Sequence, residues 1–323
     1  MVLSTFVFLI VFVLTTSWRA TVRERTAEAA YPPTGEIVTV DGVRMHAQIQ
    51  GSGPDLVLIH GSSGSLRDFN FGLMAELSRS WRVIAVDRPG LGWSDAAPGT
   101  DTISRQAALI RKTAAHFGAD MPVVLGQSYG GAVALAWAVE APDSLSALVT
   151  VSTPSHPWVT GLSMFYRLTA HPVGQAILVP LLSAFVPAER LVREVNSVFA
   201  PQTAPHGYAE HFGPGMTLRR KTLRANARQR AQLLHDITAL SQRYNEIIIP
   251  VEIVHGDADP AVGLSIHAQR FESEVSSASL TVLKGIGHMP HHSAVSEVVA
   301  AAERATNRAG LRQSPPEPTH RGS

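Results

Sequence analysis

The residue with the clearest chemical potential is a serine that stands between two glycines. Residues 123–131 read Val-Val-Leu-Gly-Gln-Ser-Tyr-Gly-Gly, so a short apolar run stops at Ser128, with Gly126 before it and Gly130 after it. This spacing is typical of a strand that turns into a helix within two residues, a turn too crowded for side chains at either glycine. The pattern predicts that Ser128 projects from the apex as a nucleophile.

A helix is expected directly after this serine, because residues 132–139 are small or apolar. The N-terminus of such a helix points free amide groups and the positive end of its dipole at Ser128. That environment favours the negative charge of a tetrahedral oxyanion.

A serine hydroxyl is a poor nucleophile at neutral pH, so it needs a base and a carboxylate that holds the base in the right tautomer. Two loops downstream offer these groups. Asp257 and Asp259 follow the apolar run 251–255, and His288 follows the apolar run 280–283. From the residues alone, either carboxylate could orient the histidine. The order serine, acid, histidine is the one expected for an α/β-hydrolase.

Short apolar runs bounded by turn residues predict the strands that position these groups. From residue 56 onward the runs are mostly continuous rather than alternating, and helical patterns separate them, which favours a parallel sheet covered on both faces. The first two runs, joined through Asp41 and Gly42, predict an antiparallel hairpin at the edge. The eight candidate strands are 36–40, 44–50, 56–60, 83–87, 123–125, 147–151, 251–255 and 280–283.

A long segment between the sixth and seventh strands has a helical pattern broken by prolines, and it is far too long for an ordinary loop. We expect residues 153–246 to form a helical cap over the carboxyl ends of the strands, where open α/β sheets keep their sites. Its apolar side chains either line an acyl pocket above Ser128 or only pack the cap onto the core. These side chains are Met164, Phe165, Tyr166, Ile177, Leu178, Phe185, Phe199 and Phe212.

Four separated motifs, taken in order, resemble the α/β-hydrolase superfamily from about Pro32 to Ala302, in the capped, esterase- or lipase-like branch with a serine nucleophile. They are His-Gly-Ser-Ser-Gly at 60–64, Asp-Arg-Pro-Gly-Leu-Gly-Trp-Ser-Asp at 87–95, the turn at Ser128, and the paired acid and histidine loops. The resemblance implies an α/β fold with an eight-stranded, mostly parallel sheet, helices on both faces and an inserted helical cap.

The resemblance also assigns roles. It implies that Asp259 rather than Asp257 orients His288, and that the backbone amides of Ser62 and Tyr129 form the oxyanion hole. The loop 87–95 is then structural.

These assignments predict hydrolysis of a small-molecule carboxylic ester with an apolar acyl part, through an acyl-enzyme and without cofactor or metal. A serine at position 128 disfavours the epoxide-opening and dehalogenating mechanisms, which proceed through an aspartyl ester. Two alternatives stay open on the same scaffold: a carbon–carbon bond hydrolase or cofactor-free perhydrolase, and a non-catalytic ligand-binding homologue. The oligomeric state is not indicated.

Three histidines stand close together near the end of the chain, a pattern that can indicate a metal site. His291 and His292 follow His288 closely, but no carboxylate stands beside them in the sequence. We therefore expect no metal there.

The composition limits the function further. The net charge of +1 over 323 residues gives no electrostatic footprint for nucleic acid, and the dense arginines between Arg219 and Arg230 are expected to form the solvated face of a helix. Without cysteine the chain has no disulfide, thiolate nucleophile or Cys-based metal site.

The first 18 residues carry no charge and are mostly apolar, so they predict a membrane anchor or a signal peptide. Arginines at 19, 23 and 25 follow the apolar run, and the nearest Ala-x-Ala is at 27–29, which favours a retained anchor over a secreted or periplasmic, cleaved form. The positive-inside rule puts the arginine-flanked end in the cytoplasm.

The resulting division of the chain is an anchor or signal at 1–18, a linker at 19–31, a hydrolase core at 32–152 and 247–303, the cap at 153–246, and a disordered tail at 304–323.

Overall fold

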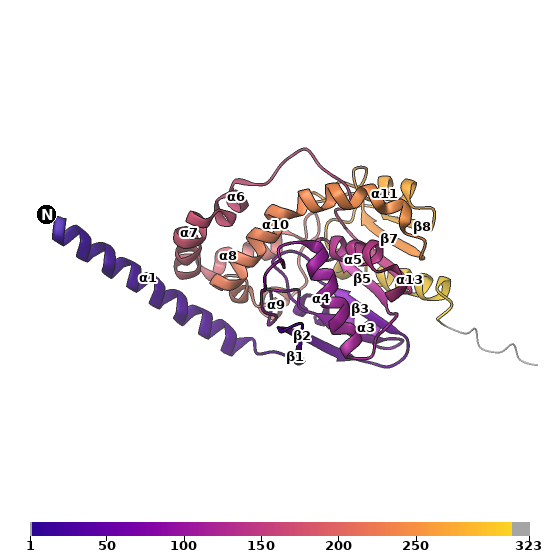
Figure 1. Cartoon of the computed structure of the whole chain (residues 1–323), viewed down its shortest axis with the longest axis horizontal. Helices are drawn as coiled ribbons and strands as arrows, with labels where there is room; N and C mark the ends of the chain where they lie inside the picture. Colours follow the sequence, from indigo (N-terminus) through magenta and orange to yellow (C-terminus); the bar gives the residue numbers. More distant parts are fainter. Residues whose placement is uncertain (1, 312–323) are drawn as a thin grey trace, which may run out of the picture.

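The computed structural model describes residues 2–311 and is built around one eight-stranded sheet with the order β1-β2-β4-β3-β5-β6-β7-β8 (Figure 1). The outer β1 pairs antiparallel with β2, and β2 pairs antiparallel with β4, whereas all other neighbours are parallel. The strands are β1 (Glu36–Val40), β2 (Val43–Gln50), β3 (Asp55–Ile59), β4 (Arg82–Val86), β5 (Val123–Gln127), β6 (Ala147–Val151), β7 (Val251–Gly256) and β8 (Ala278–Leu283). The expected fold class is confirmed.

Helices cover both faces of the sheet. One apolar cluster joins the sheet to α4, α5 and α11, and a second joins the opposite face to α3 and α13. Burial on both faces explains why the parallel strands are continuous apolar runs. The core helices are α2 (Arg67–Asn70), α3 (Leu73–Leu77), α4 (Ile103–His116), α5 (Tyr129–Glu140), α11 (Ala268–Glu274), α12 (Pro290–Ser293) and α13 (Val295–Arg308).

The segment between β6 and β7 is helical and lies on one side of the core (Figure 1). It contains α6 (Met164–Ala170), α7 (Pro172–Phe185), α8 (Ala188–Ser197), α9 (Tyr208–Phe212) and α10 (Arg220–Leu240). We refer to this segment, residues 153–246, as the cap.

The arginines expected on a solvated helix face are in fact contact residues. Arg219, just before α10, is 1% exposed and pairs with Glu28 at 2.9 Å, and Arg228 pairs with Asp101 at 3.0 Å. The expectation was wrong for the buried Arg219, because its carboxylate partner lies far away in the sequence, whereas Arg228 forms a half-exposed ion pair.

The N-terminal helix α1 (Val2–Ala30) does not stop at the end of the apolar run. Residues 19–30, expected as a linker, continue the helix and pack on the cap, where Glu24 makes a bidentate ion pair with Arg220 at 2.8 Å. The first half of α1 projects beyond the rest of the molecule (Figure 1). The helix is long and apolar enough to cross a membrane, although a signal sequence meets the same criteria.

At the other end, the helix α13 continues to Arg308, beyond the expected start of the tail at residue 304. Ala301, Ala302 and Ala305 are fully buried against the sheet, and Arg304 donates to Glu252 at 2.7 Å. The remainder of the expected tail, residues 312–323, lies outside the described residues.

Candidate active site

Ser128 sits at the sharp turn between β5 and α5. Its backbone adopts φ 51° and ψ −119°, a left-handed conformation that non-glycine residues rarely take, so the local structure must hold it there. A Cβ added to Gly126 would overlap the carbonyl of Gly130, and one added to Gly130 would overlap the carbonyl of Ile59. The two glycines therefore permit the turn that presents Ser128 to the site.

A continuous chain of hydrogen bonds runs from this serine to a buried carboxylate. His288 Nε2 lies 3.0 Å from Ser128 Oγ, and His288 Nδ1 lies 2.8 Å from Asp259 Oδ2. The serine is 8% exposed, the histidine side chain 12% exposed, and the carboxylate fully buried. Three residues from three separate loops thus meet within hydrogen-bonding distance, the arrangement that a serine nucleophile with a general base requires.

The geometry distinguishes the two candidate carboxylates. Asp259 contacts His288 and accepts hydrogen bonds from the amides of Ala261 and Val262 at 2.8 and 3.0 Å. Burial raises the pKa of Asp259, but the hydrogen bond and charge of His288 together with these amides outweigh burial, so the pKa lies below its ordinary value. Asp257, in contrast, is exposed and accepts from the amide of Gly285.

The loop after β3 approaches the serine closely enough to supply an oxyanion donor. A Cβ added to Gly61 would lie 3.3 Å from Ser128 Cβ, so the Gly61–Ser62 peptide lies against the nucleophile. Tyr129, the first residue of α5, carries the other expected amide at the positive end of that helix. Both candidate amides belong to segments that flank Ser128.

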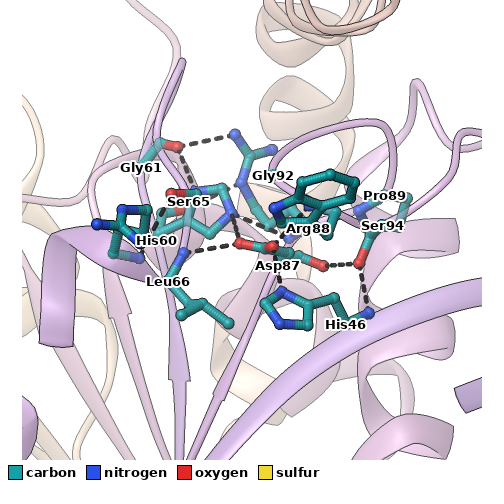
Figure 2. A network of polar contacts seen from close by, with 12 residues as sticks. His46, His60, Gly61, Ser65, Leu66, Asp87, Arg88, Pro89, Gly92 and Ser94 are labelled. Atoms are coloured by element: carbon teal, nitrogen blue, oxygen red, sulfur yellow. Dashed lines mark hydrogen bonds and ion pairs between the residues drawn. The ribbon is translucent and has the colours of Figure 1, made fainter. Parts of the chain in front are cut away.

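A buried arginine contacts this loop through two of its carbonyls (Figure 2). Arg88 donates from Nη2 to the carbonyl of Gly61 and from Nε to the carbonyl of His60, both at 2.9 Å. Because the Gly61 carbonyl and the Ser62 N–H share one trans peptide, a carbonyl directed at Arg88 directs the N–H the opposite way. The guanidinium also lies 4.2 Å from the ring centre of Tyr129. Arg88 therefore contacts both segments that carry the candidate oxyanion amides.

Asp87 anchors the same region from its other side (Figure 2). Its carboxylate is fully buried and contacts His46 Nδ1 at 2.6 Å, and it accepts from the amides of Leu66 at 2.7 Å and Trp93 at 2.8 Å. Burial raises the pKa of Asp87, but His46, the charge of His60 and the amide of Trp93 together outweigh burial, so the pKa lies below its ordinary value. This network gives the loop 87–95 the structural position that the resemblance implied.

Two amide side chains of the cap form hydrogen bonds with the loop after β3 and with the loop that carries His288. Asn226 on α10 accepts from the amide of Ser63 and donates to its hydroxyl, both at 2.9 Å. Gln202 accepts from the amide of Gly287 at 2.9 Å and donates to the carbonyl of Gly285 at 2.7 Å. The cap therefore helps to position both the loop after β3 and the histidine loop.

A cluster that the sequence did not indicate lies behind the histidine loop. Asp68 on α2 contacts His291 at 3.1 Å and His292 at 2.8 Å, and it accepts from the hydroxyl of Tyr208 on the cap at 2.6 Å. The missing neighbouring carboxylate is therefore supplied by a residue more than 200 positions away. The group could hold a metal ion by composition, but its distances are those of direct hydrogen bonds that occupy both carboxylate oxygens. Burial lowers the pKa of His291 to about 4, which suits a neutral ring that donates to Asp68.

The apolar cap side chains that could either line an acyl pocket or pack the cap differ in burial. Phe199 is buried in a cluster with Tyr208 and Met289. Four others, on α6 and α7, are instead exposed. These four are Met164, Phe165, Ile177 and Phe185.

The fold and the geometry of the site can now be compared with known proteins. Residues 54–295 match the family described as the alpha/beta hydrolase fold, and the chain belongs to that family. An uncharacterized protein of Mycobacterium tuberculosis (strain ATCC 25618 / H37Rv) is 29% identical over 284 residues, which cover 84% of this chain and 81% of the relative.

Solved structures share the fold at lower identity. The epoxide hydrolase CorEH is 21% identical with a TM-score of 0.71, and the esterase RhEst1 from Rhodococcus sp. ECU1013 is 24% identical with a TM-score of 0.64; each match covers 86% of this chain and 99% of the other. A membrane phospholipase A, described as a bacterial virulence factor, is 18% identical with a TM-score of 0.66 and matches 97% of both chains. Family and neighbours together support a hydrolase.

Proposed function

We propose that the chain hydrolyses carboxylic esters through an acyl-enzyme intermediate. The observation that carries this proposal is the hydrogen-bonded chain from Ser128 through His288 to Asp259, with distances of 3.0 and 2.8 Å. Ester hydrolysis by these three residues requires only the protein and water.

The geometry supports a definite role for each residue. His288 Nε2 takes the proton of Ser128 as the alkoxide attacks the acyl carbonyl, and Asp259 stabilises the imidazolium that forms. The amides of Ser62 and Tyr129 bind the oxyanion. His288 then protonates the leaving alcohol, the ester bond breaks, and water activated by the same histidine releases the acid from Ser128.

The nucleophile favours ester cleavage over the other chemistries of the family's neighbours. Epoxide opening and dehalogenation in this superfamily proceed through an aspartyl ester, whereas position 128 is a serine. An apolar helix that projects from the body further supports a protein held at a membrane by α1, and an ester with an apolar acyl part suits that location.

The test uses the full chain in detergent with a fluorophosphonate probe and a series of p-nitrophenyl esters of increasing acyl length. We expect labelling at Ser128, loss of labelling and turnover in Ser128→Ala and His288→Ala, and wild-type behaviour in Ser279→Ala, which changes an exposed serine of β8. Turnover of a diketone without ester turnover would instead favour the carbon–carbon hydrolase. Ligand binding without turnover or labelling would favour a non-catalytic homologue.

A further inference from the structure

Helices α6 and α7 of the cap carry several large apolar side chains that are exposed. Ile177 is 60% exposed and Phe165 is 46% exposed. From residue 144 to residue 188 the only Asp, Glu, Lys or Arg is Arg167. Helix surfaces that face water normally carry charges, and exposed apolar patches mark interaction sites. We call this group the apolar cap face: Met164, Phe165, Leu168, Val173, Ile177 and Phe185.

This face is fixed to the N-terminal helix at one end. Arg19 and Arg23 of α1 both donate to the carbonyl of Ala184, at 2.8 and 3.0 Å, and Arg23 also donates to the carbonyl of Val186 at 2.6 Å. The guanidinium of Arg19 lies 5.4 Å from the ring centre of Phe185. The C-terminal end of α7 therefore lies beside Arg19 of α1.

The position of Arg19 along α1 indicates where the membrane boundary would lie. It is the first charged residue of the chain, and the 17 helical residues before it, 2–18, span about 26 Å at 1.5 Å per residue. The hydrocarbon core of a bilayer is about 30 Å thick. If residues 2–18 cross the bilayer, Arg19 lies at its boundary, and so does the end of α7. Figure 1 shows α6 and α7 on the side of the body toward which the first half of α1 extends.

We propose that the apolar cap face rests in the surface of the lipid bilayer that α1 crosses, so that the cap contacts lipid directly. The face continues the apolar surface of α1, and it meets α1 where the basic side chains of Arg19, Arg23 and Arg25 begin. Basic residues beside an apolar surface suit a membrane with anionic headgroups. The inference rests on α1 being retained and does not depend on which bond the site cleaves.

The chain offers a direct test because it contains no cysteine. Ile177→Cys is labelled with the environment-sensitive dye NBD in the full chain, reconstituted into nanodiscs of phosphatidylcholine and phosphatidylglycerol. The matched control is Met121→Cys, which changes a residue of similar exposure, 52%, ahead of β5 at the end of the sheet away from the cap. Phe165→Cys provides a second position on the face in case one variant folds poorly.

We expect doxyl-labelled lipid to quench the dye at position 177 at least three-fold more than at 121, and aqueous iodide to show the reverse order. Equal iodide quenching at 177 and 121 with no lipid quenching would overturn the proposal. Protection from both quenchers that disappears with one chain per nanodisc would also overturn it, because a second copy would then cover the face. Failure of the full chain to enter nanodiscs would remove its basis.

Discussion

The contact between Arg88 and the Gly61 carbonyl makes a sharp prediction for the substitution Arg88→Lys. Arg88 donates to four buried acceptors, two of them carbonyls of the loop after β3 and two of them the side chains of Gln106 and Gln229 at 2.8 Å. Burial lowers its pKa to about 10, so the guanidinium stays charged at neutral pH. Lysine keeps the charge but presents three donors from one point, so it cannot reproduce the fork.

The size of the expected effect on kcat follows from the role of the Arg88 guanidinium in orienting the Ser62 amide. Complete loss of an oxyanion donor costs about 3 kcal/mol in transition-state stabilisation. In Arg88→Lys the Ser62 amide remains, and the Gly61 carbonyl keeps its contact with His60 Nδ1 at 2.9 Å. We therefore expect a loss below the full value, about 2 kcal/mol, which is roughly a 30-fold drop in kcat. KM for a p-nitrophenyl ester should change little, because the oxyanion contact strengthens only in the transition state.

The assay measures kcat, KM and thermal stability for Arg88→Lys beside Arg228→Lys, a control at a half-exposed pair with Asp101. The control should keep kcat within about two-fold, as expected for a surface ion pair. A variant with lowered Tm but unchanged kcat would show that Arg88 supports folding alone. A raised KM at constant kcat would place it in substrate binding, and either result refutes the reasoning.

Three further predictions concern the acid, the buried histidines and the N-terminal helix. Asp259→Asn should lower kcat by about 10⁴-fold because it favours the wrong histidine tautomer, whereas Asp257→Asn should stay within a few-fold; equal losses would contradict the assignment. Burial lowers the pKa of His60 and of His267 to about 4, against about 6.5 unfolded, so the unfolded chain binds more protons between these values. The contribution of each neutral histidine to the free energy of unfolding should be fully present above pH 6.5. It should fall toward pH 4 by up to about 1.4 kcal/mol per pH unit for each histidine. A Tm that does not change over this pH range would refute the prediction. Glu24→Gln should weaken the docking of α1 on the cap and speed limited proteolysis near residue 30, and an unchanged cleavage rate would show that the ion pair does not hold the helix.

Much of the fold and the centre of the candidate site were accessible from the sequence because they depend on local patterns. The parallel strands are buried on both faces, so they appear as continuous apolar runs. The glycines at 126 and 130 indicate the turn at Ser128. His288 follows the apolar run 280–283. Choosing Asp259 over Asp257 needed the resemblance, since both carboxylates follow the same strand.

The rest depends on contacts between distant residues, which a local pattern does not encode. His46 and His156 are buried against carboxylates that lie far away in the sequence, Asp87 and Glu274 respectively. The cluster around Asp68 joins residues more than 200 positions apart. Residues 19–30 looked like a charged linker for the same reason.

The docking of α1 bears on whether the protein can be shed into solution. The Ala-x-Ala at 27–29 lies within an unbroken helix, which a processing peptidase would first have to unwind. A cut after residue 29 would also remove Glu24 and Glu28, the carboxylates that pair with Arg220 and Arg219. A released form would consequently lose these contacts and be less stable than the tethered one.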